Sequence, residues 1–124
     1  MKLEEYEDII NSTDISNRSL QFYLDGMSEE SGEIAGVFKR IRRGDFGEDV
    51  KREITEIEDN LAKLIKEHPK IKMAIIHEIG DREWYTNRFL KTIDSNMNEV
   101  LEENAKKVKR RISDGTIMGD GDER

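Results

Sequence analysis

Apolar residues recur every three or four positions along most of this chain, and Pro69 is its only proline. That spacing gathers apolar side chains on one face of an α-helix, and a chain with so little proline leaves long helices uninterrupted. Only 35% of the residues are apolar and 40% are charged. A sheet buried on both faces needs continuous apolar strands, so this composition argues against it and favours amphipathic helices.

The pattern predicts five helices separated by turn-forming residues. They span Leu3 to Ile10, Asn17 to Arg43, Glu48 to Glu67, Lys70 to Ile93 and Asn96 to Ile112. The helix over 48–67 has the clearest pattern, with apolar spacings of four and three until His68 and Pro69 end it. Gly26 allows a break within the second helix, and Asp94 and Ser95 offer an N-cap for the last one.

Helices that each have one apolar face bury those faces best against one another. The predicted fold class is therefore all-α, an antiparallel helical bundle of four to five helices. By length the 124 residues form one domain, taken as 1–113, followed by a Gly- and Asp-rich tail over 114–124. Because the apolar content looks small for a monomeric bundle, we expect a homodimer or homotetramer in which a second chain covers exposed apolar faces.

Charge and composition narrow the range of partners. A net charge of −7 argues against duplex nucleic acid, which is bound through Lys and Arg contacts to phosphates. The chain has no Cys, so it forms no disulfide and no thiolate metal site. Without a basic leader or a long apolar run, we expect a soluble cytoplasmic protein with no membrane partner. An acidic protein that binds a phosphorylated ligand generally needs a divalent cation to offset the repulsion.

Two pairs of acidic residues stand out from a background of 28. Glu30 with Glu33, and Glu78 with Asp81, each share a helix face with apolar residues, so these carboxylates are expected to point toward the core. Four converging carboxylates on rigid helices suit Mg²⁺, with Mn²⁺ as the second choice. The alternative is that the four acids form salt bridges with Lys and Arg of neighbouring helices, and the residues alone leave both interpretations open.

Other site chemistries fit the sequence less well. Glu56 and Asp59 form a third acidic pair, but they border the apolar face of their helix and are interpreted as surface charge. His77 and Glu78 begin like the helix of a zinc protease, yet the second His that this chemistry needs is replaced by Asp81. The chain has no Walker-type phosphate loop and no set of residues for a Ser-His-Asp or Cys-His mechanism.

Three segments resemble the motifs of MazG-like pyrophosphohydrolases, whose pattern is Glu-Glu-x-x-Glu followed, after a spacer, by Glu-x-x-Asp. GMSEESGE at 26–33 resembles the first metal motif, and HEIGDREWY at 77–85 resembles the second. NAKKVKRR at 104–111 is similar to the later Asn-x-x-Lys-x-x-x-Arg element, and the tail GTIMGDGDER is similar to tails of phage and mobile-element members. The resemblance spans nearly the whole chain, in order.

The resemblance implies a reaction and a set of site residues. The reaction is hydrolysis of a nucleoside triphosphate between its α and β phosphates, as housekeeping of the nucleotide pool. The implied metal ligands and catalytic residues are Glu30, Glu33, Glu78 and Asp81, with Mg²⁺ as the cofactor. The implied substrate contacts are Tyr85, Asn104, Lys107 and Arg111. Without the resemblance, Tyr85 is more often a core residue, and Lys107 and Arg111 fit a solvated basic surface.

The chain also departs from the family pattern. The segment between Glu33 and Glu78 is longer than usual, which indicates an insertion around 48–70, and Arg82 and Glu83 stand where relatives generally have apolar residues. Two alternatives stay open. One is a relative with a narrower substrate, such as a dUTPase or a phosphoribosyl-ATP pyrophosphohydrolase. The other is a non-catalytic helical regulatory or interaction protein.

Overall fold

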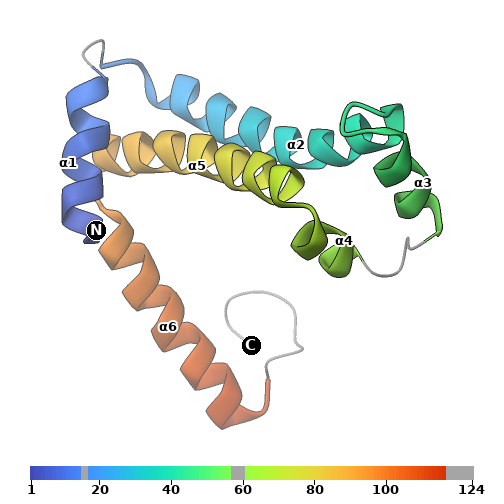
Figure 1. Ribbon diagram of the computed structural model, residues 1–124. Coiled ribbons are helices and arrows are strands. Elements are labelled where there is room, and N and C mark those ends of the chain that lie inside the picture. The colour runs from blue at the N-terminus through green and yellow to red at the C-terminus, as the bar shows by residue number, and fades with distance from the viewer. Residues whose placement is uncertain (15–16, 57–60, 117–124) are drawn as a thin grey trace. The chain divides into compact units, whose positions relative to one another are not determined.

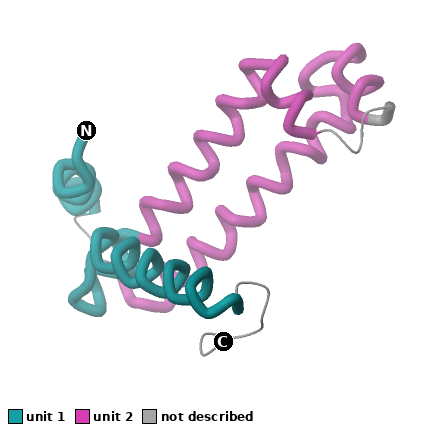
Figure 2. Tube along the Cα trace, turned by 90° about the horizontal axis from the view of Figure 1, so that it is seen from below, with its two compact units in different colours: residues 1–17, 87–124 teal, residues 18–86 magenta. Residues whose placement is uncertain are grey.

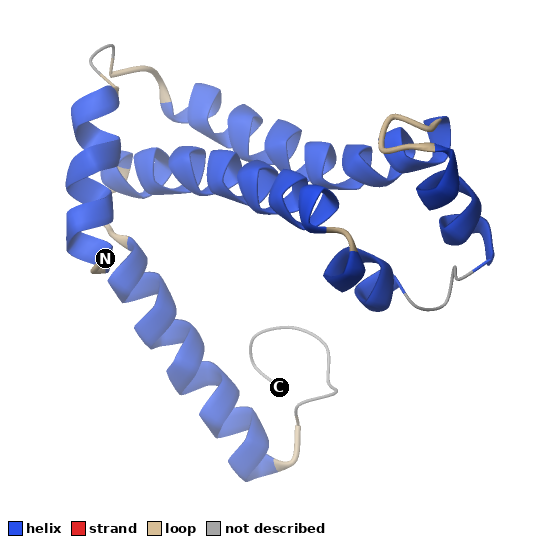
Figure 3. Ribbon diagram, viewed as in Figure 1, coloured by secondary structure: helices blue, strands red, loops and turns tan. Residues whose placement is uncertain are grey.

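The computed structural model describes residues 1–14, 17–56 and 61–116, with the backbone alone at 55 and 56. Over these ranges the chain forms six helices and no strand (Figure 3). The all-α prediction is confirmed, whereas the predicted count of four to five helices is too low. Among the described residues, no helix is both long enough and apolar enough to cross a membrane.

The chain divides into two compact units, which we describe separately (Figure 2). Unit 1 consists of residues 1–17 and 87–124, and unit 2 of residues 18–86. The single domain predicted over 1–113 therefore stays a prediction. The last helix ends at Asp114, and most of the predicted tail lies outside the described residues.

Unit 2 contains α2 (Leu20–Arg43), α3 (Glu48–Glu56), α4 (Leu61–Glu67) and most of α5 (Pro69–Thr92). Helix α2 begins later than predicted because Ser19 is its N-cap, with a side chain that accepts a hydrogen bond from the amide of Phe22. It continues through Gly26 without a break. It ends at Gly44, whose φ of 96° lies in the left-handed region that favours glycine at helix C-termini.

The single helix predicted over 48–67 is wrong. Helices α3 and α4 run in different directions (Figure 1), and the intervening residues 57–60 lie outside the described part of the chain. The apolar residues of the pattern still face the core, because Val50 and Ile54 of α3 and Leu64 of α4 are all buried.

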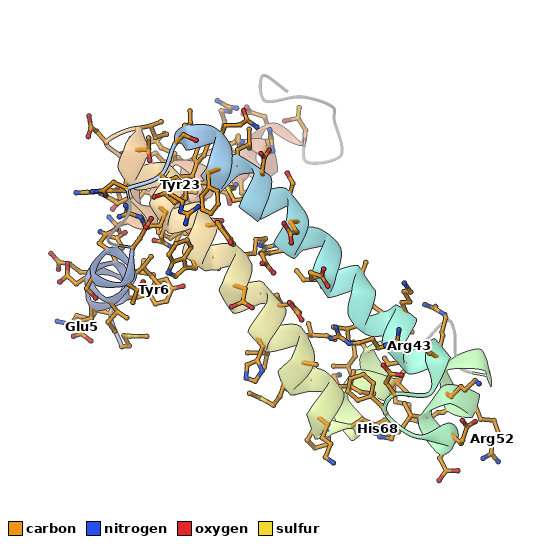
Figure 4. All side chains as sticks on the ribbon, turned by 90° about the horizontal axis from the view of Figure 1, so that it is seen from above. Glu5, Tyr6, Tyr23, Arg43, Arg52 and His68 are labelled. Carbon is orange, nitrogen blue, oxygen red and sulfur yellow. The ribbon has the colours of Figure 1, made fainter. Side chains whose placement is uncertain are left out.

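The aliphatic core of unit 2 lies where the end of α2 meets α3, α4 and the start of α5. Its buried members are Val37, Ile41, Val50, Ile54, Leu64 and Ile71. Beside this core, Oε2 of Glu53 on α3 lies 2.8 Å from Nε2 of His68. His68, labelled in Figure 4, directly precedes α5. Helices α2 and α5 lie side by side and run in opposite directions, since α2 ends at the core and α5 starts there (Figures 1 and 2).

An aromatic cluster holds the other end of this helix pair. Phe22 and Tyr23 of α2 meet Trp84 and Tyr85 of α5, with ring centroids 6.0 Å apart for Phe22 and Tyr85. Tyr23 is almost fully buried. Gly26 is buried beneath Tyr85, and a Cβ atom at this position would overlap the Tyr85 ring. Glycine within a helix costs about 0.5–1 kcal/mol relative to alanine, and here it permits close side-chain packing between two helices.

This contact predicts opposite effects for two glycine substitutions on α2. Gly26→Ala should destabilise the protein by about 1–3 kcal/mol, because the added methyl displaces the Tyr85 ring. Gly32→Ala is the matched control, since a Cβ there meets nothing within 4 Å, and it should stabilise by about 0.5–1 kcal/mol. Urea unfolding measures both free energies. A Gly26→Ala protein as stable as the Gly32→Ala protein would contradict the assigned contact.

Unit 1 contains α1 (Leu3–Thr13), the end of α5 and α6 (Met97–Asp114). Arg88 of α5 is buried, and its guanidinium donates to Asp14 Oδ2 at 2.8 Å, Asn11 Oδ1 at 2.8 Å and Asn17 Oδ1 at 3.0 Å. Asn11 and Asp14, predicted as turn-forming residues after the first helix, thus serve as partners of a buried arginine, with Asn11 inside α1, which extends to Thr13. A buried ion pair of this kind typically costs about 3–5 kcal/mol when one partner is removed.

The N-terminus of α6 is capped differently from the prediction. The predicted caps were Asp94 and Ser95, but Asn96 is the N-cap, and its side chain accepts from the amide of Glu99 at 2.9 Å. Asp94 instead adopts a φ of 57°, within the turn that follows α5. Asn tolerates the cap position as well as Asp, so the sequence pattern alone offers several adjacent choices.

Candidate metal centre

Three carboxylates predicted as metal ligands come together between α2 and α5. Glu30, Glu78 and Asp81 each offer one oxygen atom, and these atoms lie within 4.8 Å of one another. Glu30 follows Gly26 by one helical turn, and Asp81 precedes Tyr85 by one turn, so the Gly26–Tyr85 contact aligns the two helices at this level. Glu30 and Glu78 are partly buried and Asp81 is exposed.

The fourth predicted ligand, Glu33, does not join this cluster. Its side chain is exposed rather than turned toward the core, and its Oε2 lies near Gly36 on the same helix. A step of three residues rotates a side chain by about 60° from the position of Glu30, which is enough to leave the interface of the two helices. The role of Glu33 as a metal ligand stays a prediction.

Repulsion within the cluster alters the titration of Glu30. Burial raises the pKa of Glu30, and the negative charges of Asp81, Glu78, Glu29 and Glu33 raise it further. A carboxyl whose pKa is higher in the folded than in the unfolded chain favours the folded state at low pH, and that contribution is lost as the pH rises through the folded pKa. At neutral pH the ionised carboxylate of Glu30 therefore opposes folding when no cation is present.

One of the three carboxylates has a basic partner. Nη2 of Arg40 lies 3.6 Å from Oε1 of Glu78. The salt-bridge alternative thus holds for Glu78, although the two side chains are 32% and 20% exposed and such a pair contributes at most about 1 kcal/mol. Among the described residues, neither Glu30 nor Asp81 forms an ion pair with Lys or Arg. Arg40 was not singled out from the sequence.

The donor set fits a hard divalent cation. Three carboxylate oxygens from two rigid helices match the oxygen ligands that Mg²⁺ and Mn²⁺ prefer, and they leave coordination positions for water or phosphate. Burial is the main cause that raises the pKa of Glu30, and a cation would offset the neighbouring negative charges that raise it further. Glu30, Glu78 and Asp81 are the residues that would hold it.

Tyr85 belongs both to the aromatic cluster and to the surroundings of the carboxylates. Burial raises the pKa of Tyr85, the charges of Glu30, Glu29 and Asp81 raise it further, and Arg18 opposes them. The phenol is therefore neutral at physiological pH and keeps its proton as a hydrogen-bond donor. Its half-buried ring packs on Gly26 and Phe22, so the core interpretation holds for the ring.

The remaining predicted site residues lie on α6, within unit 1. Asn104 is exposed, Lys107 is half-buried and Arg111 is buried. Asn104 and Lys107 line the same surface pocket along α6, together with Lys106. Their predicted contacts with the substrate, like that of Arg111, stay predictions.

Comparison of the chain with protein-family models, with curated proteins and with solved structures finds no match. The interpretation of the site therefore depends on the motif residues themselves and on the positions that the helices give them.

The electrostatics of the cluster predict how Glu30→Gln affects the metal-free protein. Removing one of several repelling charges should stabilise the protein at pH 7 by about 0.5 kcal/mol, the size of like-charge repulsion at neighbouring helix positions. The advantage should shrink as the pH falls and Glu30 of the wild type becomes protonated. Thermal unfolding in EDTA at pH 7 and at pH 4 tests this. A variant less stable than wild type at pH 7 would show that Glu30 is not under net repulsion.

Proposed function

We propose that this protein is a Mg²⁺-dependent nucleoside triphosphate pyrophosphohydrolase of the MazG-like kind, which cleaves (d)NTP to (d)NMP and pyrophosphate. The observation that carries the proposal is the convergence of Glu30, Glu78 and Asp81. These residues come from two motifs far apart in the sequence, and their carboxylate oxygens lie within 4.8 Å of one another.

The roles of the residues follow from their chemistry. Glu30, Glu78 and Asp81 hold Mg²⁺, or Mn²⁺ in its place, and Glu33 is the proposed fourth ligand. When bound, the cation offsets charge on phosphate oxygens and lowers the pKa of a water molecule. Tyr85 contacts the nucleotide with its neutral phenol. Asn104, Lys107 and Arg111 contact the substrate, with the two basic residues stabilising charge on the leaving pyrophosphate.

Exposed apolar side chains support the proposed homodimer or homotetramer. Large apolar residues are exposed on α5 at Met73, Ile76 and Ile79 and on α6 at Val100 and Leu101. Apolar surface that recurs along a helix is commonly covered by a partner, and a second copy of the chain meets this need. Sedimentation equilibrium measures the assembly, and a monomer at all concentrations contradicts it.

The activity is tested by pyrophosphate release from a panel of ribo- and deoxyribonucleoside triphosphates with Mg²⁺. Glu30→Gln, Glu78→Gln and Asp81→Asn should each lower kcat by at least about 100-fold, because each removes charge at the cation. Glu29→Gln is the matched control, since its carboxylate is exposed and lies outside the cluster, and it should retain near wild-type turnover. Activity that survives Glu33→Gln would limit the ligand set to three residues.

The same panel separates the alternatives. Release confined to dUTP or to phosphoribosyl-ATP would identify a relative with a narrow substrate. A folded protein that releases pyrophosphate from no nucleotide would contradict the proposal and favour a non-catalytic helical regulatory protein.

A further inference from the structure

Arg40 occupies one side of the carboxylate cluster. Its guanidinium Nη2 lies 3.6 Å from Oε1 of Glu78, and both side chains are partly buried. Glu78 therefore has neighbours of both charges: Arg40 attracts its carboxylate, and the carboxylates of Glu30 and Asp81 repel it. One carboxylate of the cluster is neutralised by a residue of the chain itself.

The charge of Arg40 acts on part of the cluster. Among the described residues, Arg40 pairs with Glu78, and neither Glu30 nor Asp81 forms an ion pair with Lys or Arg. Arg40 thus offsets the charge of Glu78, while Glu30 lies beside the two other carboxylates of the cluster. A divalent cation that takes one oxygen from each of the three carboxylates would have to share Glu78 with Arg40 or replace it.

Arg40 also has a second acidic residue within electrostatic range. A hydrogen bond from Arg43 is the main cause that holds the pKa of Asp45 below its usual value, and the charge of Arg40 adds to it. The backbone of Arg40 is fixed by the C-cap of α2, where its carbonyl accepts from the amide of Asp45 at 3.0 Å. Release of Glu78 therefore needs only a side-chain movement, and it does not leave the guanidinium without a nearby anion.

We propose that Arg40 is the internal counter-ion of the carboxylate cluster, and that a divalent cation displaces it from Glu78 on binding. This inference rests on the proposed metal site. The Arg40–Glu78 ion pair stabilises the metal-free protein, and the need to displace Arg40 raises the cation concentration at which the site fills. Arg40 is thus a positioning residue that regulates occupancy of the site through Glu78.

Binding of Mn²⁺ alone, without nucleotide, tests the exchange by the electron paramagnetic resonance signal of free Mn²⁺. Arg40→Gln should bind Mn²⁺ about fivefold more tightly than wild type, which corresponds to ~1 kcal/mol and to the upper range for an exposed ion pair. Arg40→Lys keeps the charge and should bind close to wild type. Arg43→Gln is the matched control, because it removes a charge from the same helix at a residue paired with Asp45.

A second readout separates this role from a merely structural one. Without metal, Arg40→Gln should unfold at a lower temperature than wild type, and saturating Mn²⁺ should raise its melting temperature by more than it raises that of wild type. If wild type binds Mn²⁺ and Arg40→Gln binds it equally or more weakly, the counter-ion role is overturned while the metal site stands. If neither protein binds Mn²⁺, the metal site fails, and the counter-ion role fails with it.

Discussion

Apolar packing at both ends of the α2–α5 pair is the interaction on which the organisation of unit 2 depends, because it holds repelling carboxylates on two facing helices. Two like charges about 5 Å apart repel by roughly 3 kcal/mol at an effective dielectric constant of 20, and partial exposure to water weakens this. The helix pair tolerates the repulsion because apolar contacts hold both of its ends. An aliphatic core around Ile41 and Ile71 secures one end, and the aromatic cluster around Tyr23 and Trp84 secures the other. The carboxylates occupy the level between them.

The helices were largely predictable from the sequence. Apolar residues that recur every 3.6 positions indicate a helix with one buried face, and this holds regardless of which element covers that face. The same reasoning failed over 48–67. A periodic pattern cannot distinguish one long helix from two short helices whose apolar faces meet at a common core, as those of α3 and α4 do. Capping was predicted only to within two residues, because Asp94, Ser95 and Asn96 all suit an N-cap.

The candidate site was predictable in part. The motif resemblance singled out Glu30, Glu78 and Asp81, whose proximity depends on how two distant helices align. Spacing along α2 could not reveal that Glu33 is exposed while Glu30 is partly buried, because the position of α5 decides which residues of α2 are covered. Arg40 gave no signal among the basic residues near the end of α2, since its pairing with Glu78 depends on the alignment of α2 with α5. The sequence allows a break in α2 at Gly26. In the structure this residue instead permits the close contact with Tyr85, because it has no Cβ atom.

The central claim is that Glu30, Glu78 and Asp81 together hold a divalent cation. A crystal structure of the protein grown with Mn²⁺, with anomalous diffraction data collected near the manganese absorption edge, tests this claim most directly. The account predicts an anomalous peak bonded to a carboxylate oxygen of each of the three residues, at the roughly 2.0–2.2 Å expected for such a cation. A fully grown crystal with no peak between α2 and α5, or with Mn²⁺ only on other acidic surfaces such as that of α1, would contradict it.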